Sequence, residues 1–182
     1  MSVPEPAAEW LETLDGLVAG GGLVLVIGPV DSGKTTFVRD LANCALGQGR
    51  AVGVVDADTG QSEVGPPTCV TFGTVREPIA RLSDVRPEAS GFVGSISPQW
   101  TLPEHLAQTC SMVRAARRSG AELVICDTTG LADAPWSDRL KRMKIEALAP
   151  DHVVVLSRGS LAPQLDRLLS CLSYPLVHRL PV

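Results

Sequence analysis

The sequence predicts an α/β fold in which helices cover both faces of a mainly parallel sheet. Short aliphatic runs alternate along the chain with longer stretches in which apolar residues recur at helical spacing. Runs of four or five residues rich in Val, Ile and Leu are typical of strands buried on both faces of a parallel sheet. Right-handed crossovers through the intervening helices then give a three-layer α/β/α sandwich.

Four main strands and four helices follow from these patterns. The expected strands are Leu23–Ile27, Ala51–Val55, Glu122–Cys126 and Val153–Leu156. The expected helices are Thr35–Leu46, Leu102–Ser119, Ser137–Leu148 and Leu161–Leu172. Thr101 and Glu104 predict a capping box at the start of the second helix. Shorter strands are expected near Cys69–Phe72 and Phe92–Val93, and Pro175–Leu180 is expected to form an edge strand.

Length, charge and cysteine content limit the function classes. A chain of 182 residues can form one domain over residues 1–182, with residues 1–20 as an N-terminal lead-in. The net charge of −4 gives no overall attraction to nucleic acid or to an anionic membrane, so any nucleic-acid contact must be local. No apolar run is long enough to span a bilayer, and no membrane partner is expected. Five cysteines without a C-x-x-C pair, and an N-terminus without a basic region, favour a cytoplasmic protein.

The segment from Gly28 to Thr35, G-P-V-D-S-G-K-T, matches the phosphate-binding pattern G-x-x-x-x-G-K-[ST] in full. Its glycines let backbone N–H groups point at a phosphate, and the following helix adds its positive N-terminal end. Lys34 is expected to bridge phosphate oxygens, and the Thr35 hydroxyl to bind Mg²⁺. The alternative is a glycine-rich turn with an unrelated lysine, but the flanking strand and helix favour a P-loop NTPase fold that binds a nucleotide and Mg²⁺. The residues expected to bind the nucleotide are Gly28, Pro29, Val30, Asp31, Ser32, Gly33, Lys34, Thr35 and Thr36.

Carboxylates follow two other expected strands. Asp58 and Gln61 come shortly after Ala51–Val55, and Asp127 follows Glu122–Cys126. Because the carboxyl ends of neighbouring parallel strands line the ligand crevice, we expect Asp58 and Asp127 to lie near the Mg²⁺. Asp58 can hold the metal or accept the proton of an attacking hydroxyl, and Gln61 can orient the nucleophile or a metal-bound water. The alternatives are that Asp56 and Asp58 only cap a turn and that Asp127 belongs to an ordinary strand-ending turn.

The sequence favours adenine over guanine as the base of the nucleotide. Guanine-specific switches usually place an Asn/Thr-Lys-x-Asp motif after a strand near the C-terminus. Here Val153–Leu156 is followed by S-R-G-S, and N-K-x-D occurs nowhere in the chain. ATP is therefore the expected nucleotide.

Together these motifs resemble the RNA 5′-hydroxyl kinase family, which includes the kinase subunit of the mRNA cleavage and polyadenylation factor and the pre-rRNA-processing kinases. The phosphate loop and the D-x-D-x-G-Q segment from Asp56 to Gln61 are similar to the first two motifs of that family. Residues 92–98, F-V-G-S-I-S-P, resemble its F-x-G-x-x-S-P segment, and residues 128–131, T-T-G-L, are similar to its T-x-G-W clasp, which grips the substrate. The resemblance extends from about Gly22 to Leu156.

The resemblance implies a polynucleotide 5′-hydroxyl kinase that transfers the γ-phosphate of ATP to an RNA or DNA end, in RNA processing or repair. It implies that Lys34 stabilises the transferring phosphoryl group and that Thr35 and Asp58 hold Mg²⁺. It further implies that Asp58 activates the 5′-hydroxyl, that Gln61 assists at the metal or nucleophile, and that Thr128 positions the substrate backbone. The sequence does not identify protein partners.

The chain departs from the family pattern at the clasp and at the lid. Leu131 stands where the clasp has Trp, so aromatic stacking is not expected there. The arginine-rich lid helix of the family is expected after a strand such as Pro175–Leu180, and neither a lid nor a C-terminal domain is expected in these residues. Either the chain is part of a longer protein, or Arg158 or a partner takes the role of the lid, or ATP is bound without fast chemistry.

Other interpretations stay open at this point. A catalytically weak, ATP-binding assembly module fits the expected absence of a lid, and a dimerising, switch-type NTPase shares the D-x-x-G strand end that begins at Asp127. The basic run from Arg139 to Lys144 fits a contact with a phosphate backbone or a solvated helix face. Trp100 and Trp136 lie in expected loops, where ordinary packing is favoured over stacking on a base.

Overall fold

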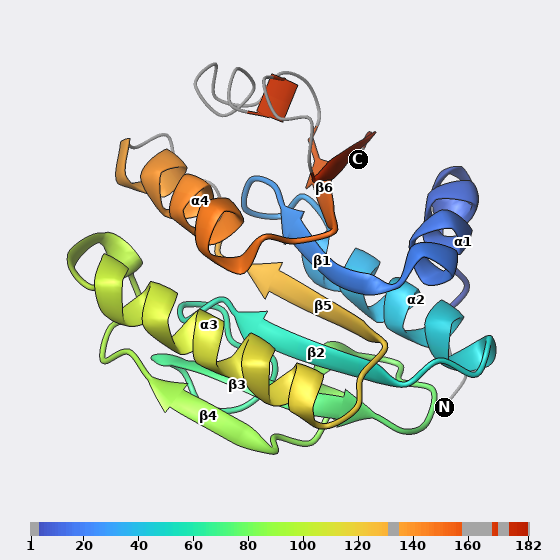
Figure 1. Ribbon diagram of the computed structural model, residues 1–182, viewed down its shortest axis with the longest axis horizontal. Helices are drawn as coiled ribbons and strands as arrows, with labels where there is room; N and C mark the ends of the chain where they lie inside the picture. Colours follow the sequence, from blue (N-terminus) through green and yellow to red (C-terminus); the bar gives the residue numbers. More distant parts are fainter. Residues whose placement is uncertain (1–3, 131–134, 158–168, 171–174, 182) are drawn as a thin grey trace.

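The computed structural model describes residues 4–130, 135–157, 169–170 and 175–181 of the chain. Its described strands form one sheet of seven, which are β1 (Gly22–Ile27), β2 (Val52–Ala57), β3 (Cys69–Val75), β4 (Ala89–Phe92), β5 (Leu123–Thr128), β6 (His152–Leu156) and β7 (Leu176–Leu180). The strand order is β4-β3-β2-β5-β1-β6-β7 (Figure 1). Strands β2, β5, β1, β6 and β7 run parallel, whereas β3 and β4 are antiparallel at one edge. The prediction of a mainly parallel sheet is confirmed.

Helices cover both faces of this sheet, which confirms the three-layer sandwich. They are α1 (Leu11–Gly20), α2 (Lys34–Gly47), α3 (Leu102–Arg118) and α4 (Pro135–Leu148), with short 3₁₀ helices η1 (Ala8–Trp10), η2 (Leu82–Asp84) and η3 (Pro98–Trp100). One hydrophobic cluster joins α1 and α2 to the sheet, and a second joins α3 and α4 to its opposite face. The expected helix Leu161–Leu172 lies almost entirely outside the described residues.

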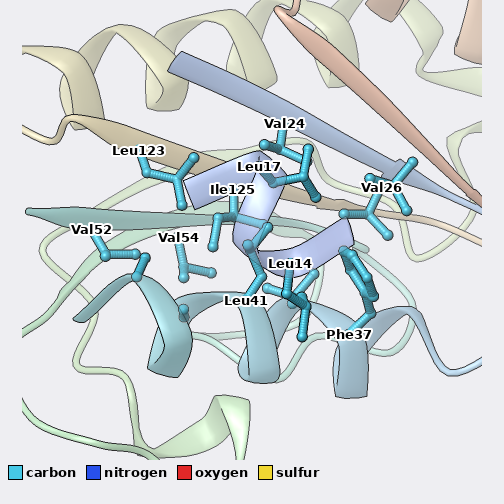
Figure 2. Packing of buried hydrophobic residues seen from close by; sticks show 14 of the residues in the cluster. Leu14, Leu17, Val24, Val26, Phe37, Leu41, Val52, Val54, Leu123 and Ile125 are labelled. Carbon is cyan, nitrogen blue, oxygen red and sulfur yellow. The ribbon is translucent and has the colours of Figure 1, made fainter. Parts of the chain in front are cut away.

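The N-terminal lead-in contributes a helix to the core that the sequence analysis did not predict. Leu14 and Leu17 of α1 are fully buried and belong to the same cluster as Phe37 and Leu41 of α2 (Figure 2). The ring of Trp10 lies edge-on to that of Phe37, with 5.3 Å between the ring centres. Burial of these large side chains makes the lead-in an integral part of the layer over the phosphate loop.

The irregular stretch after β2 forms the antiparallel edge of the sheet. β3 begins at Cys69, as expected, and extends to Val75. β4 ends at Phe92, so it precedes the expected position at Phe92–Val93 by about three residues. The Phe92 side chain is 72% exposed on this edge strand, which explains why hydrophobicity alone misplaced the strand.

The predicted capping box at the start of α3 is wrong. Thr101 makes no side-chain cap hydrogen bond, and its torsions, φ −130° and ψ 34°, are not the extended ones of a capping residue. Pro103 at the second helical position removes one of the two N–H groups that a capping hydroxyl can bond, and the buried Oγ1 of Thr101 has no hydrogen-bond partner among the described residues. The helix therefore begins without the reciprocal bonds that Thr101 and Glu104 suggested.

The register of the sheet brings two acidic side chains together. β2 and β5 are adjacent and parallel, with Asp56 opposite Asp127 and Ala57 opposite Thr128. β1 pairs with the other side of β5 and leads directly into the phosphate loop. The carboxyl ends of these three strands therefore define one site.

The described residues contain neither a helix that could span a membrane nor a disulfide bond. No helix in that part of the chain has both the length and the apolarity that a bilayer span needs. The described cysteines, Cys44, Cys69, Cys110 and Cys126, are unpaired, and Cys171 lies outside the described residues. A cytoplasmic location stays a prediction.

Candidate functional site

The phosphate loop connects β1 to α2, as the motif predicts. The hydroxyl of Ser32 and the ammonium of Lys34 both donate to the carbonyl oxygen of Pro29, at 2.9 and 2.6 Å. Lys34 is 7% exposed, and burial lowers the pKa of its amine, although the carboxylates of Asp127 and Asp58 act in the opposite direction. These bonds close the loop around its own backbone and hold the lysine at its centre.

The first position of the loop has room only for glycine. A Cβ atom on Gly28 would lie 2.5 Å from the carbonyl oxygen of Leu156 and 2.5 Å from Oγ of Ser32. The first of these atoms belongs to the backbone of β6 and cannot rotate away. This close approach is the observation that fits a nucleotide phosphate, because the loop must stay tightly curled for its N–H groups to converge.

Thr35 and Asp127 form the expected metal side of the site. The Thr35 hydroxyl donates to Oδ2 of Asp127 at 3.0 Å, and the N–H of Thr128 donates to Oδ1 at 2.8 Å. Burial, together with the nearby Asp56, raises the pKa of the Asp127 carboxyl to about 7. No group of three His, Cys, Asp or Glu side chains suited to a metal occurs among the described residues. The hydroxyl of Thr35 and the carboxylate of Asp127 are oxygen ligands of the kind that Mg²⁺ takes beside phosphate oxygens and water.

Asp56 organises the loop that follows β2. Its Oδ2 accepts hydrogen bonds from the N–H groups of Glu63 and Val64, both at 2.8 Å, and its Oδ1 accepts from the N–H of Asp58 at 2.9 Å. Burial raises the pKa of Asp56 to about 6, despite these backbone donors. Sequence reasoning assigned Asp56 no role beyond capping a turn, and its bonds to backbone N–H groups are of that kind. The structure makes it the residue that fixes the position of Asp58.

Asp58 both caps a turn and faces the site. Its Oδ1 accepts from the N–H groups of Gly60 and Gln61, at 3.1 and 3.0 Å, so the turn-capping interpretation is correct as far as it goes. Asp58 also lines a cleft of about 600 Å³ against the phosphate loop. The residues that line this cleft are Asp31, Ser32, Gly33, Lys34, Thr35, Thr36, Asp58, Gln61, Ser62 and Glu63. The cleft brings predicted nucleotide ligands together with Asp58 and Gln61.

Thr128, in contrast, does not line this cleft. Its side chain is fully buried, and its hydroxyl donates to the carbonyl oxygen of Val26 at 2.8 Å. The neighbouring Gly130 lies against the phosphate loop, since a Cβ atom there would be 2.4 Å from Cγ2 of Val30. Leu131 and Arg158 lie outside the described residues. The role of Thr128 in positioning a substrate stays a prediction.

The basic run on α4 is only partly a solvated face. Arg139 and Arg142 are exposed, and Arg142 pairs with Glu146 at 2.8 Å. Lys141 and Lys144 are fully buried, so neither of the two interpretations from the sequence describes them. Their spacing gives the signal that was missed, because both share a helical face with the buried Ile145.

Trp100 also differs from expectation. It ends η3 and is 84% exposed, so the predicted packing of this loop residue is wrong. The buried member of its short helix is Pro98. Trp136 is half-buried at the start of α4.

Comparison with known families identifies one match over most of the chain. Residues 28–182 match the family model described as mRNA cleavage and polyadenylation factor CLP1 P-loop. A polyribonucleotide 5′-hydroxyl-kinase of Pyrococcus horikoshii is 37% identical over 135 residues, which cover 74% of this chain and 37% of that protein. A polynucleotide 5′-hydroxyl-kinase of Danio rerio is 33% identical over 153 residues, which cover 81% of this chain and 21% of that protein. The chain thus spans less than half the length of these relatives.

Solved structures support the same fold. A wild-type Clp1p–Pcf11p complex has a chain that matches with a TM-score of 0.70 at 16% identity, covering 93% of this chain and 46% of that one. The GDP complex of a signal recognition particle protein from Aeropyrum pernix matches with a TM-score of 0.51 at 21% identity, covering 85% and 37%. At these identities the likeness establishes the P-loop NTPase fold, as predicted.

Replacing Gly28 by Ala should open the phosphate loop. The added methyl group meets backbone that cannot move, so we expect nucleotide affinity to fall by about tenfold or more. Isothermal titration with ATP and Mg²⁺ measures this change. Gly47→Ala is the matched control, because nothing lies within 4 Å of the added Cβ at the end of α2. Equal affinities of both variants and the wild type for ATP would contradict the role of Gly28 in shaping the phosphate loop.

The free energy of unfolding of the ligand-free protein should depend on pH through the titration of Asp127. The carboxyl has a pKa of about 7 in the folded state, well above its ordinary value of 3.8, so its proton stabilises the folded state at low pH. This contribution is complete below about pH 4 and is lost as the pH rises to about 7. Urea unfolding of the wild type and Asp127→Asn, without metal, should show the wild type losing stability relative to the variant across that range. A difference that is constant with pH would refute the assignment.

Proposed function

The chain belongs to the family of the mRNA cleavage and polyadenylation factor CLP1 P-loop domain, and from that premise we propose that it is an ATP- and Mg²⁺-dependent polynucleotide 5′-hydroxyl kinase. The proposed reaction transfers the γ-phosphate of ATP to the 5′-hydroxyl of an RNA or DNA end. The relatives named above carry kinase names of this kind. They support the proposal, although this chain covers only part of their length.

One observation carries the proposal beyond nucleotide binding. The cleft that contains Lys34 and Thr35 is also lined by Asp58 and Gln61. A carboxylate that is held by backbone N–H groups and faces a phosphate loop is suited to accept a proton from a hydroxyl. An assembly module that only retains ATP has no need of this second half of the cleft.

The residues have separate roles in the proposed step. The acceptor 5′-oxygen forms a bond to the γ-phosphorus, the bond to the β–γ bridging oxygen breaks, and ADP leaves. Asp58 takes the proton of the hydroxyl, and Gln61 holds the acceptor in line. Lys34 balances the negative charge that develops on the transferring group. Mg²⁺, held on the side of Thr35 and Asp127, supplies further charge neutralisation when it is bound.

Exposed apolar side chains on the segment before α3 favour a polynucleotide as the acceptor. Ile96 and Trp100 are 63% and 84% exposed on the segment that precedes α3. The carbonyl oxygen of Ile96 accepts from the hydroxyl of Thr59, next to Asp58, at 3.5 Å. Flat or apolar side chains at such a position can stack on a base of a single strand without reading its sequence. Such contacts do not depend on charge, which suits a chain whose net charge of −4 gives no overall attraction to nucleic acid.

The proposed function is tested by transfer of label. The protein is incubated with γ-labelled ATP, Mg²⁺ and oligonucleotides that carry a 5′-hydroxyl, with separate RNA and DNA arms. We expect labelled 5′-ends, and no label on matched oligonucleotides that already carry a 5′-phosphate. Release of labelled inorganic phosphate alone, without labelled oligonucleotide in either arm, would exclude the proposal.

Asp58→Asn tests the proposed base. The amide keeps the size of the side chain but accepts a proton poorly, so kcat should fall by about a hundredfold to ten-thousandfold. The Kd for ATP should change much less, because Lys34 and the loop are intact. Glu63→Gln removes the same charge from the rim of the same cleft and should alter kcat by less than about threefold. Similar losses in both variants would point to general electrostatics instead of proton transfer.

A further inference from the structure

Two lysines on α4 are fully buried, which is exceptional for this residue type. Lys141 and Lys144 lie one helical turn apart and have no measurable exposure to solvent. Burial lowers the pKa of both amines. Removing an ammonium from water is costly unless acceptors replace the lost hydration. The question for each lysine is therefore which acceptors replace the water that its Nζ has lost.

Lys141 is fully satisfied by one short segment. Its Nζ donates to the hydroxyl of Thr128 at 3.3 Å, to the hydroxyl of Thr129 at 3.2 Å, and to the carbonyl oxygen of Thr129. An ammonium has three N–H donors, and this segment provides three acceptors. The end of β5 thus supplies a hydrogen-bond acceptor for every donor of this side chain.

Lys144 has no such set of hydrogen-bond acceptors in the part of the chain that the structure describes. Its Nζ is buried and has no hydrogen-bond partner among the described residues. The carboxylates of Asp58, Asp127 and Asp56 and the thiol of Cys126 favour its charge, but they act only through their field. The two lysines share a helix, burial and charge, and they differ in contact with residues 128–129.

The segment that Lys141 holds also touches the phosphate loop. The Thr128 hydroxyl that accepts from Lys141 donates in turn to the carbonyl oxygen of Val26, at the end of β1. Gly130 packs against Val30 so closely that a Cβ atom would lie 3.0 Å from the backbone nitrogen of Val30. A polar chain therefore extends from α4, through the end of β5, to β1, and the packing of Gly130 against Val30 brings the same segment against the nucleotide-binding loop.

We propose that Lys141 is a positioning residue, which fixes the segment 128–130 against the phosphate loop so that this segment can hold the acceptor end. The proposal rests on the proposed kinase function in what it says of the acceptor. The geometry of the segment can be tested without that function. Lys144 makes no contact with the segment and has no part in its positioning.

The experiment compares Lys141→Met with Lys144→Met. Each variant replaces a buried ammonium by an apolar side chain of similar length, so the loss of charge and the change in volume are matched. Thr129→Val is a milder third variant, because it removes a single acceptor of Lys141 and keeps the carbonyl oxygen. Three quantities are measured in each: amide hydrogen exchange at Thr129 and Gly130, the Kd for ATP, and kcat and KM for a 5′-hydroxyl oligonucleotide.

In Lys141→Met we expect exchange at Thr129 and Gly130 to accelerate by about tenfold, because the hydrogen bonds that Lys141 donates to residues 128–129 are lost. The oligonucleotide KM should rise by about the same factor, while the Kd for ATP stays within about twofold, since the loop keeps its own bonds to Pro29. Thr129→Val should change the same quantities less. Lys144→Met should leave exchange at Thr129 and Gly130 and the oligonucleotide KM unchanged, and its urea midpoint should rise because a buried amine without a hydrogen-bond partner among the described residues is removed.

The outcomes separate the two proposals. Equal exchange in Lys141→Met and Lys144→Met would overturn the positioning role, whether or not the protein transfers phosphate. Faster exchange in Lys141→Met with an unchanged oligonucleotide KM would overturn the link to the acceptor. If the wild type labels no oligonucleotide, the kinase function fails, and the exchange rates still decide whether Lys141 positions residues 128–130.

Discussion

The compensation of buried carboxylates at the end of the sheet is the constraint on which the site depends. Asp56 and Asp127 are opposite each other on adjacent parallel strands, and both are almost completely buried. Burial raises the pKa of both carboxyls, and a nearby carboxylate adds to the rise in each case, Asp58 for Asp56 and Asp56 for Asp127. Each carboxylate must find donors nearby, and the donors that the chain provides are the elements of the site itself.

The two carboxylates are compensated in different ways, and each arrangement has a structural result. Asp56 accepts from backbone N–H groups, which fixes the loop that carries Asp58. Asp127 accepts from the hydroxyl of Thr35 and lies close to Lys34, which ties the phosphate loop to β5. The first holds the proposed acceptor side of the cleft, and the second holds its nucleotide side. Their adjacency in the sheet keeps the two sides in a constant relation.

The sequence predicted the parts of this molecule whose signal is local. The phosphate loop is a contiguous motif, and the aliphatic runs of β1, β2, β5 and β6 record burial on both faces, so both could be identified in advance. Helix α1 was missed because its short apolar pattern resembles an ordinary lead-in, and only packing against α2 reveals its burial. Trp100 was misjudged for the converse reason, since nothing local shows that a large aromatic residue is left exposed. Lys141 was missed because a lysine is read as solvated unless its acceptors, remote in sequence, are known.

Trp10 gives the molecule a property of a different kind. Its indole is 6% exposed, lies 5.3 Å from the ring of Phe37, and is the nearest atom group to the position where a Cβ on Gly33 would lie, at 3.7 Å. The indole Nε1 donates to the carbonyl oxygen of Pro181, at 3.5 Å. A displacement of the first turn of α2 changes the surroundings of this ring, and with them its fluorescence. Trp10 is thus an intrinsic fluorescent reporter beside the phosphate loop, and its indole also bonds to Pro181 near the other end of the sequence.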